Sequence, residues 1–137
     1  MRNIRLFLLT IIMAIAAMPS EAKVVKVSNM YMFGFSASFK DSTIYVTDIQ
    51  DVQNVWMESK SHFLLDIDQY SYQLKDYLAD SQNSPSRVCI VFFATEKKKA
   101  EKQYIKLMKK YKKGYDIQYL NITQFQFKAI EREEEQE

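Results

Sequence analysis

The sequence predicts an α/β or α+β fold with a mixed sheet of four or five strands, an N-terminal β-hairpin, a C-terminal βαβ unit and helices covering the sheet. Three observations support this fold. The segment Val88–Ala94 is an unbroken apolar run, residues 31–39 alternate strictly, and residues 96–113 carry a helical apolar stripe directly after the run.

The run from Val88 to Ala94 is too short for a typical buried helix and is rich in β-branched and aromatic residues. A strand without polar residues is typical of a sheet covered on both faces. We therefore expect Arg87–Thr95 to be the central strand. Cys89, which lies inside it, is expected to be a buried small apolar residue.

Residues 31–39 place aromatic side chains on one face and Gly34, Ser36 and Ser38 on the other. This alternation predicts a strand whose small face a helix, a neighbouring main chain or a ligand approaches closely. Lys40–Ser42 is a turn signal, and Thr43–Ile49 has the β-branched content of a second strand. The two strands should pair as an antiparallel hairpin.

Two helices are predicted between this hairpin and the apolar run. Apolar residues at helical spacing from Ile49 to Ser59 indicate the first, and Tyr70, Leu74, Tyr77 and Leu78 indicate the second. The polar segment 81–86 predicts a surface loop.

The stripe after the apolar run predicts a helix that ends near Gly114, and it consists of Ala100, Tyr104, Leu107, Met108 and Tyr111. Residues 115–120 alternate and predict a strand. A strand, a helix and a strand over this length form a βαβ unit, so the two strands should be parallel. Phe125 and Phe127 belong to a final short strand or an extended tail.

The length of 137 residues predicts one domain, which we place at residues 23–130. Residues 1–22 have the pattern of a signal peptide, with Arg2 and Arg5, an apolar stretch and small residues at 20 and 22. We expect export to the periplasm or the exterior, and no integral membrane protein after cleavage. Residues 131–137 are expected to form an acidic, disordered tail.

The predicted helix over residues 96–113 carries nine lysines but only two glutamates. One interpretation is a cationic face that binds a polyanion or an envelope component; the other is a solvated helix face. The residues assigned to this candidate face are Lys98, Lys102, Lys106, Lys109 and Lys113. We do not expect nucleic acid as a partner, because aromatic residues do not alternate with the lysines as a stacking surface requires.

The sequence contains no convergent catalytic or cofactor motif. Two glycines do not make a phosphate-binding loop, and one histidine with one cysteine is too few for a zinc site, so we expect neither a cofactor nor a metal. A small enzyme with His62 in a pocket, beside Ser42 or a carboxylate such as Asp48, is the third hypothesis. The first is a non-enzymatic binding module for an unknown protein, glycan or envelope component, and the second is the polyanion-binding protein described above.

Three segments support a resemblance: FGFSASFKDSTIYVTDIQ, YSYQLKDYL and RVCIVFFATEKKKAEKQYIKLMKKY. The mature chain resembles a family of small exported proteins from Gram-negative gut anaerobes, which has no assigned biochemical function. The resemblance implies bacterial export and a single domain, and it supplies no catalytic residue. In such bacteria Asp41-Ser42-Thr43 also resembles a signal for periplasmic O-glycosylation, which makes Ser42 a candidate for modification.

Overall fold

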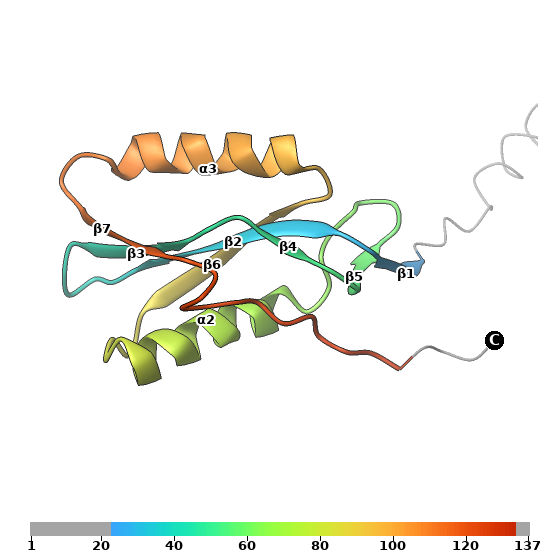
Figure 1. Ribbon diagram of the computed structural model, residues 1–137, viewed down its shortest axis with the longest axis horizontal. Helices are drawn as coiled ribbons and strands as arrows, with labels where there is room; N and C mark the ends of the chain where they lie inside the picture. The colour runs from blue at the N-terminus through green and yellow to red at the C-terminus, as the bar shows by residue number, and fades with distance from the viewer. Residues whose placement is uncertain (1–22, 134–137) are drawn as a thin grey trace, which may run out of the picture.

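The computed structural model describes residues 23–133 and confirms the predicted mixed α/β fold (Figure 1). The predicted signal peptide and the last four residues of the acidic tail lie outside the described residues. The elements, in chain order, are β1 (Val24–Val27), β2 (Met30–Ala37), β3 (Thr43–Thr47), β4 (Gln50–Val52), β5 (Val55–Glu58), α2 (Ile67–Ser81), β6 (Val88–Ala94), α3 (Lys97–Tyr111) and β7 (Asp116–Leu120).

The main sheet is built around β2. One side of β2 pairs antiparallel with β6 along seven residues, from Tyr31 opposite Ala94 to Ala37 opposite Val88. The other side pairs antiparallel with two strands, with β4 at Met30–Met32 and with β3 at Phe35 and Ser36. The predicted hairpin of β2 and β3 is therefore confirmed. A separate small sheet is formed by β1 and β5.

The predicted βαβ unit consists of β6, α3 and β7. Strand β7 pairs in parallel with β3, from Thr43 opposite Asp116 to Thr47 opposite Leu120. Since β6 and β3 are both antiparallel to β2, β6 and β7 run in the same direction, as predicted. The two strands are not neighbours, because α3 carries the chain across β2 and β3 before β7 begins.

The prediction that residues 87–95 form the central strand was wrong. Strand β2 is central, and β6 lies at the edge of the sheet with β2 as its one strand partner among residues 23–133. Both faces of β6 contact helices, which accounts for its buried apolar residues Val91 and Ala94. The position at the edge leaves Val88 and Ile90 each 47% exposed.

The predicted helix from Ile49 to Ser59 was also wrong, because this segment forms β4 and β5. Asn54 has a φ of 59°, a left-handed conformation that asparagine tolerates and that interrupts a right-handed helix. On either side of this turn, Val52, Val55 and Met57 are buried. Their spacing satisfies two short alternating strands as well as it satisfies a helix.

The two faces of the main sheet are covered differently (Figure 1). Helix α3 lies on one face, where Tyr104 packs against Phe33 and Tyr111 against Phe35. Helix α2 lies on the other face together with the extended segment 121–133, from which Phe125 and Phe127 are buried. Two elements therefore cover the face with α2, whereas α3 covers the other face alone.

The small face predicted for residues 34–38 is where α2 approaches. A Cβ atom placed on Gly34 would lie 2.6 Å from Leu74 Cδ2 and 3.2 Å from Phe127 Cζ. Glycine is therefore required at position 34 because α2 and the C-terminal segment pack directly against the main chain of β2.

Two glutamine side chains hold the C-terminal segment against α2 and β4. Gln50 Nε2 donates to the Phe125 carbonyl at 2.9 Å, and Gln50 Oε1 accepts from the Phe127 N–H at 2.8 Å. Gln73 makes the same two bonds to the carbonyl and N–H of Lys128, at 2.8 and 2.9 Å. The segment has no strand partner in the described structure, so these amides supply main-chain hydrogen bonds that a neighbouring strand would otherwise make.

Candidate functional site

The free side of β6 is the candidate site, because it is an unpaired strand edge beside exposed apolar side chains. Natural proteins usually blunt such edges with lysine, proline, a bulge or a covering loop, because unpaired main-chain groups invite another strand. The sequence of β6, VCIVFFA, contains no charged residue and no proline. Its edge therefore carries no blunting residue of its own.

The direction of each main-chain group on β6 follows from the ladder with β2. Residues that face each other in an antiparallel ladder exchange either both main-chain hydrogen bonds or none. Gly34 faces Val91, but its N–H donates to Thr47 Oγ1 at 2.8 Å, on the side of β2 away from β6. The N–H and C=O of Val91 therefore point to the free side.

Residues two positions from Val91 share its orientation, so Cys89 and Phe93 also direct their main-chain groups outward. Gln103 Nε2 of α3 lies 3.5 Å from the Phe93 carbonyl, which agrees with this orientation. The edge thus offers outward N–H groups at three alternate residues and free carbonyls at Cys89 and Val91, while the Phe93 carbonyl accepts from Gln103. Outward groups at alternate residues are the arrangement that an added strand uses.

Beside this edge, on the face covered by α3, lies a shallow apolar hollow of about 180 Å³. Its lining residues come from the ends of β2 and β6, the turn after β2 and the last turn of α3, and they are Phe35, Ala37, Ser38, Phe39, Val88, Ile90 and Tyr111. Phe39 is 99% exposed, so a large apolar side chain stands in solvent at the rim. An apolar hollow at a free strand edge is suited to hold the side chains of a bound polypeptide.

One flank of α3 extends over the same edge. Gln103 reaches β6, and Lys99, Lys106 and Lys110 lie on the same side of the helix as Gln103, at helical spacings of three, four or seven residues. Lys110 Nζ lies 5.5 Å from the centre of the Tyr111 ring, which lines the hollow. Positive charge is therefore placed above the hollow and along the edge.

Four of the five predicted binding lysines form a stripe on the solvent side of α3. Lys98, Lys102, Lys106 and Lys109 are exposed at helical positions away from the buried Ala100, and the exposed Lys113 follows the end of the helix at Tyr111. Among residues 23–133, none of the five forms an ion pair. The structure thus brings the four helical lysines together on one surface. Lys106 stands between this stripe and the flank above β6.

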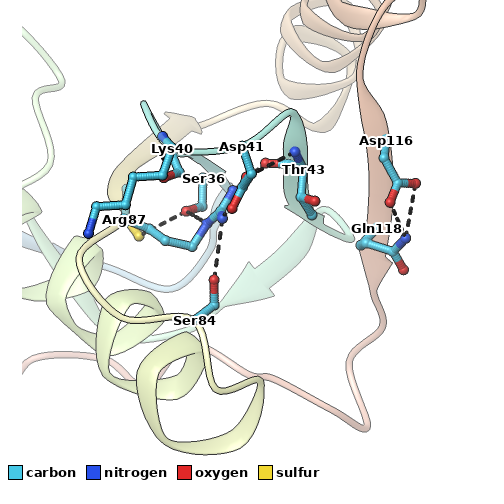
Figure 2. A network of polar contacts seen from close by, with 10 residues as sticks. Ser36, Lys40, Asp41, Thr43, Ser84, Arg87, Asp116 and Gln118 are labelled. Carbon is cyan, nitrogen blue, oxygen red and sulfur yellow. Dashed lines mark hydrogen bonds and ion pairs between the residues drawn. The ribbon is translucent and has the colours of Figure 1, made fainter.

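A buried arginine, which the sequence analysis did not single out, supports the start of β6 (Figure 2). Arg87 Nε donates to Ser36 Oγ at 3.1 Å, and Nη1 donates to Asp41 Oδ1 at 3.4 Å and to Ser84 Oγ at 3.3 Å. Nη2 donates to the Thr43 carbonyl.

The Arg87 guanidinium also lies over the Tyr45 ring, 4.9 Å from its centre. Because protein groups engage each of its three nitrogens, we assign Arg87 a structural role. It joins β2, the turn after β2 and the start of β6 on the face covered by α2, opposite the hollow. The alternation of residues 31–39 could have indicated Ser36 as a polar group needing a partner, but nothing in the sequence identified Arg87 as that partner.

The geometry around Cys89 and His62 does not assemble a nucleophile and a base. Burial raises the pKa of the Cys89 thiol above its ordinary value, and the hydrogen bond to Ser36 and the charges of Lys75 and Arg87 only partly offset this. The protonated thiol is therefore favoured. His62 is exposed, in a loop with a φ of 57°, and no hydrogen bond in the described structure joins it to Cys89 or Ser42.

The remaining sequence predictions concern modification, metals and membranes. Ser42 lies in the exposed turn between β2 and β3, as expected, and its glycosylation stays a prediction. Among residues 23–133, no three His, Cys, Asp or Glu side chains are grouped so that they could hold a metal ion. No helix in the described part of the chain has the length and apolar character needed to cross a membrane.

Comparison of the chain with protein-family models, curated proteins and solved structures gave no match. We therefore infer the function from the geometry of the β6 edge, the hollow and the lysines of α3.

Proposed function

We propose that this protein is a non-enzymatic binding module that takes up a segment of another polypeptide, in extended conformation, at the free edge of β6. The observation that carries this proposal is the coincidence of three outward-facing main-chain positions, Cys89, Val91 and Phe93, with an apolar hollow beside them. Main-chain hydrogen bonds would supply affinity, and the hollow would select side chains.

The sequence of β6 lacks protective charges and proline, which favours a binding role for its edge over an edge without function. An exposed apolar edge strand is an aggregation hazard unless something covers it. Lysine is abundant in this chain, yet none of its nineteen basic residues lies within β6. A partner strand that covers the edge gives a physical reason for leaving it apolar.

We also propose that the module works after export, on the strength of the leader-like sequence of residues 1–22. Expression of the whole chain in a Gram-negative host, followed by N-terminal sequencing of the protein in the periplasm and medium, tests this. We expect a mature protein that begins at Lys23. Recovery of the uncleaved chain in the cytoplasm would contradict export without affecting the binding proposal.

A proline substitution can test the main-chain role of the edge. Because the N–H of Cys89 points outward, Cys89→Pro removes one outward donor without removing a hydrogen bond to β2, a position where strands accept proline. The matched control is Cys89→Ala, which keeps the N–H. The probe is a displayed library of random peptides, selected on the wild-type protein.

We expect peptides selected in this way to bind Cys89→Ala and to lose binding to Cys89→Pro. Hydrogen exchange gives a second readout on the wild type, should Cys89→Pro unfold. Peptide binding should newly protect the amides of Cys89, Val91 and Phe93, whereas those of Ile90 and Phe92 are already bonded to β2. A selection that yields no binder, or binders that leave these three amides unprotected, would overturn the proposal.

A second candidate function uses the solvent stripe of α3. The observation that favours it is the alignment of four exposed lysines on α3, none of which forms an ion pair within residues 23–133. A polyanion such as heparin or polyphosphate would bind there electrostatically. The test compares heparin retention of the wild type with that of the Lys98→Glu/Lys102→Glu/Lys109→Glu variant. Elution of the wild type at low salt, no later than a charge-matched control protein, would rule this function out.

A further inference from the structure

We infer that the segment taken up by β6 is acidic, with carboxylate side chains beside the lysines of α3 and a branched apolar side chain in the hollow. This inference rests on the proposed function and specifies the chemistry of the partner. It depends on three observations, namely the charge above the edge, the charge below it, and the identity of the side chains along it.

The charge above the edge comes from the flank of α3 that carries Lys99, Lys106 and Lys110. Lys99 Nζ is 4.0 Å from Glu96 Oε1, and both side chains are largely exposed, so this pair is weak. Neither Lys106 nor Lys110 has an ion-pair partner among residues 23–133. A strand added to β6 would pass directly beneath these ammonium groups.

The charge below the edge comes from α2. Lys75 lies close enough to Cys89 to lower the pKa of the thiol, although burial outweighs this effect. Lys75 is exposed on α2, on the other face of the sheet from α3. On that face the exposed Asp68 and Asp76 of α2 accompany Lys75, so most of the positive charge that an added strand would meet comes from the flank of α3.

The side chains along β6 divide the face covered by α3 into two parts. Val88 and Ile90 border the hollow at one end, and Phe92 lies towards Gln103 at the other. An added strand would therefore place its apolar residues against Val88 and Ile90. Its acidic residues would lie on both sides of this apolar pair, within reach of Lys106 and Lys110 near the hollow and of Lys99 farther along β6.

A second copy of this chain is a poorer occupant of the same edge. Pairing of β6 with β6 around a twofold axis would place each lysine flank next to the flank of the other copy. Like charges brought together in this way oppose association. An acidic strand meets the same flank with attraction.

The experiment uses three synthetic peptides of equal length that share two branched apolar residues two positions apart. The flanking residues are glutamate in the first peptide, glutamine in the second and lysine in the third. Binding to the purified protein is measured by fluorescence anisotropy at low and moderate salt. We expect the glutamate peptide to bind at least about tenfold more tightly than the glutamine peptide, and its advantage to shrink with salt.

Two charge-reversal variants locate the effect. Lys106→Glu/Lys110→Glu changes the flank above β6, and Lys102→Glu/Lys109→Glu makes the same change in net charge on the solvent stripe. The first should weaken the glutamate peptide about tenfold or more, and the second should have little effect. Equal losses in both variants would show general attraction to a basic protein and would overturn the inference.

The outcomes separate this inference from the proposed function. If the glutamine peptide binds as tightly as the glutamate peptide, and both lose binding in Cys89→Pro, the edge is a docking site but the partner is not acidic. If no peptide binds in a way that Cys89→Pro abolishes, the proposed function itself fails. Sedimentation that shows a dimer of the wild type, abolished by Cys89→Pro, would assign the edge to a second copy and also overturn the inference.

Discussion

The two faces of the main sheet show how one chain separates stability from accessibility. On the face covered by α2, Leu74 and Phe127 approach the main chain at Gly34, and glutamine side chains fix the segment that carries Phe127. On the face covered by α3, a single helix packs through aromatic rings and leaves the hollow beside Val88 and Ile90 open. The first face therefore holds the fold together, and the second retains surface for contact.

The largest expected loss of stability appears when one phenylalanine on each face is replaced by alanine. Phe127→Ala empties a buried site on the face covered by α2 and should reduce the free energy of unfolding by about 3–5 kcal/mol. Phe92→Ala removes a half-buried ring that stacks on Phe33 at 5.0 Å and should cost clearly less. Urea denaturation of both variants measures the difference. Equal losses of unfolding free energy would mean that the face covered by α2 does not stabilise the fold more than the other face.

A smaller loss of stability is expected on replacing Arg87, which joins the start of β6 to β2 and β3. Arg87→Met keeps much of the volume but leaves Ser36 Oγ and the Thr43 carbonyl without their donor. Losing the partner of buried polar groups costs about 1–3 kcal/mol, because these groups are desolvated without compensation. Ser84→Ala is the control, since it removes only a peripheral acceptor. An Arg87→Met variant as stable as the wild type would mean that the network does not support the sheet.

A still smaller loss of folding stability is expected at alkaline pH. Burial raises the pKa of Cys89 above its ordinary value of 9.0, so the folded protein holds the thiol proton more tightly than the unfolded chain. Its contribution is fully present below pH 9 and is lost as the pH rises through the folded pKa. Urea midpoints between pH 7 and pH 10 should therefore fall more steeply for the wild type than for Cys89→Ala. Burial raises the pKa of Tyr70 and Tyr104 in the same direction, so both proteins should lose some stability.

Substitutions in the hollow should change stability least, although they should weaken peptide binding strongly. Val88→Thr and Ile90→Thr alter half-exposed side chains and should change the free energy of unfolding by no more than about 0.5 kcal/mol. The same substitutions make the hollow more polar and should weaken the peptides selected on the wild type. Ile105→Thr is the control, because Ile105 is exposed on α3 outside the hollow. Unchanged peptide binding in both edge variants would exclude the hollow from the interface.

Much of the fold follows from side-chain periodicity. The alternation around Gly34 predicted β2 and the close approach of a helix to its small face. The stripe from Ala100 to Tyr111 predicted α3, and the same periodicity placed four of the five predicted lysines on one surface, whereas Lys113 lies beyond the end of the helix. In these segments the burial of side chains decides both the pattern and the structure.

The position of β6 could not be predicted from the sequence, because an edge exposes main-chain groups that every residue carries. A run such as Val88–Ala94 is also expected of a central strand covered on both faces, so the sequence did not show that one neighbouring strand is missing. The helix prediction for Ile49–Ser59 was wrong for a different reason. Its apolar residues fit two periods, and the left-handed turn at Asn54 decided between them. The flank of α3 above the edge was missed because it is defined only once α3 and β6 are placed together.

The glutamine bonds to residues 125–128 also bear on the order in which the chain folds. Phe125 and Phe127 follow every helix and strand in the sequence, so a ribosome synthesises them after the rest of the sheet. Until they emerge, the contact between Gly34 and Leu74 lacks the Phe127 ring, and the Gln50 amide lacks its main-chain partners. During synthesis, the face of β2 that α2 covers therefore stays incomplete until residues 125–128 have been made.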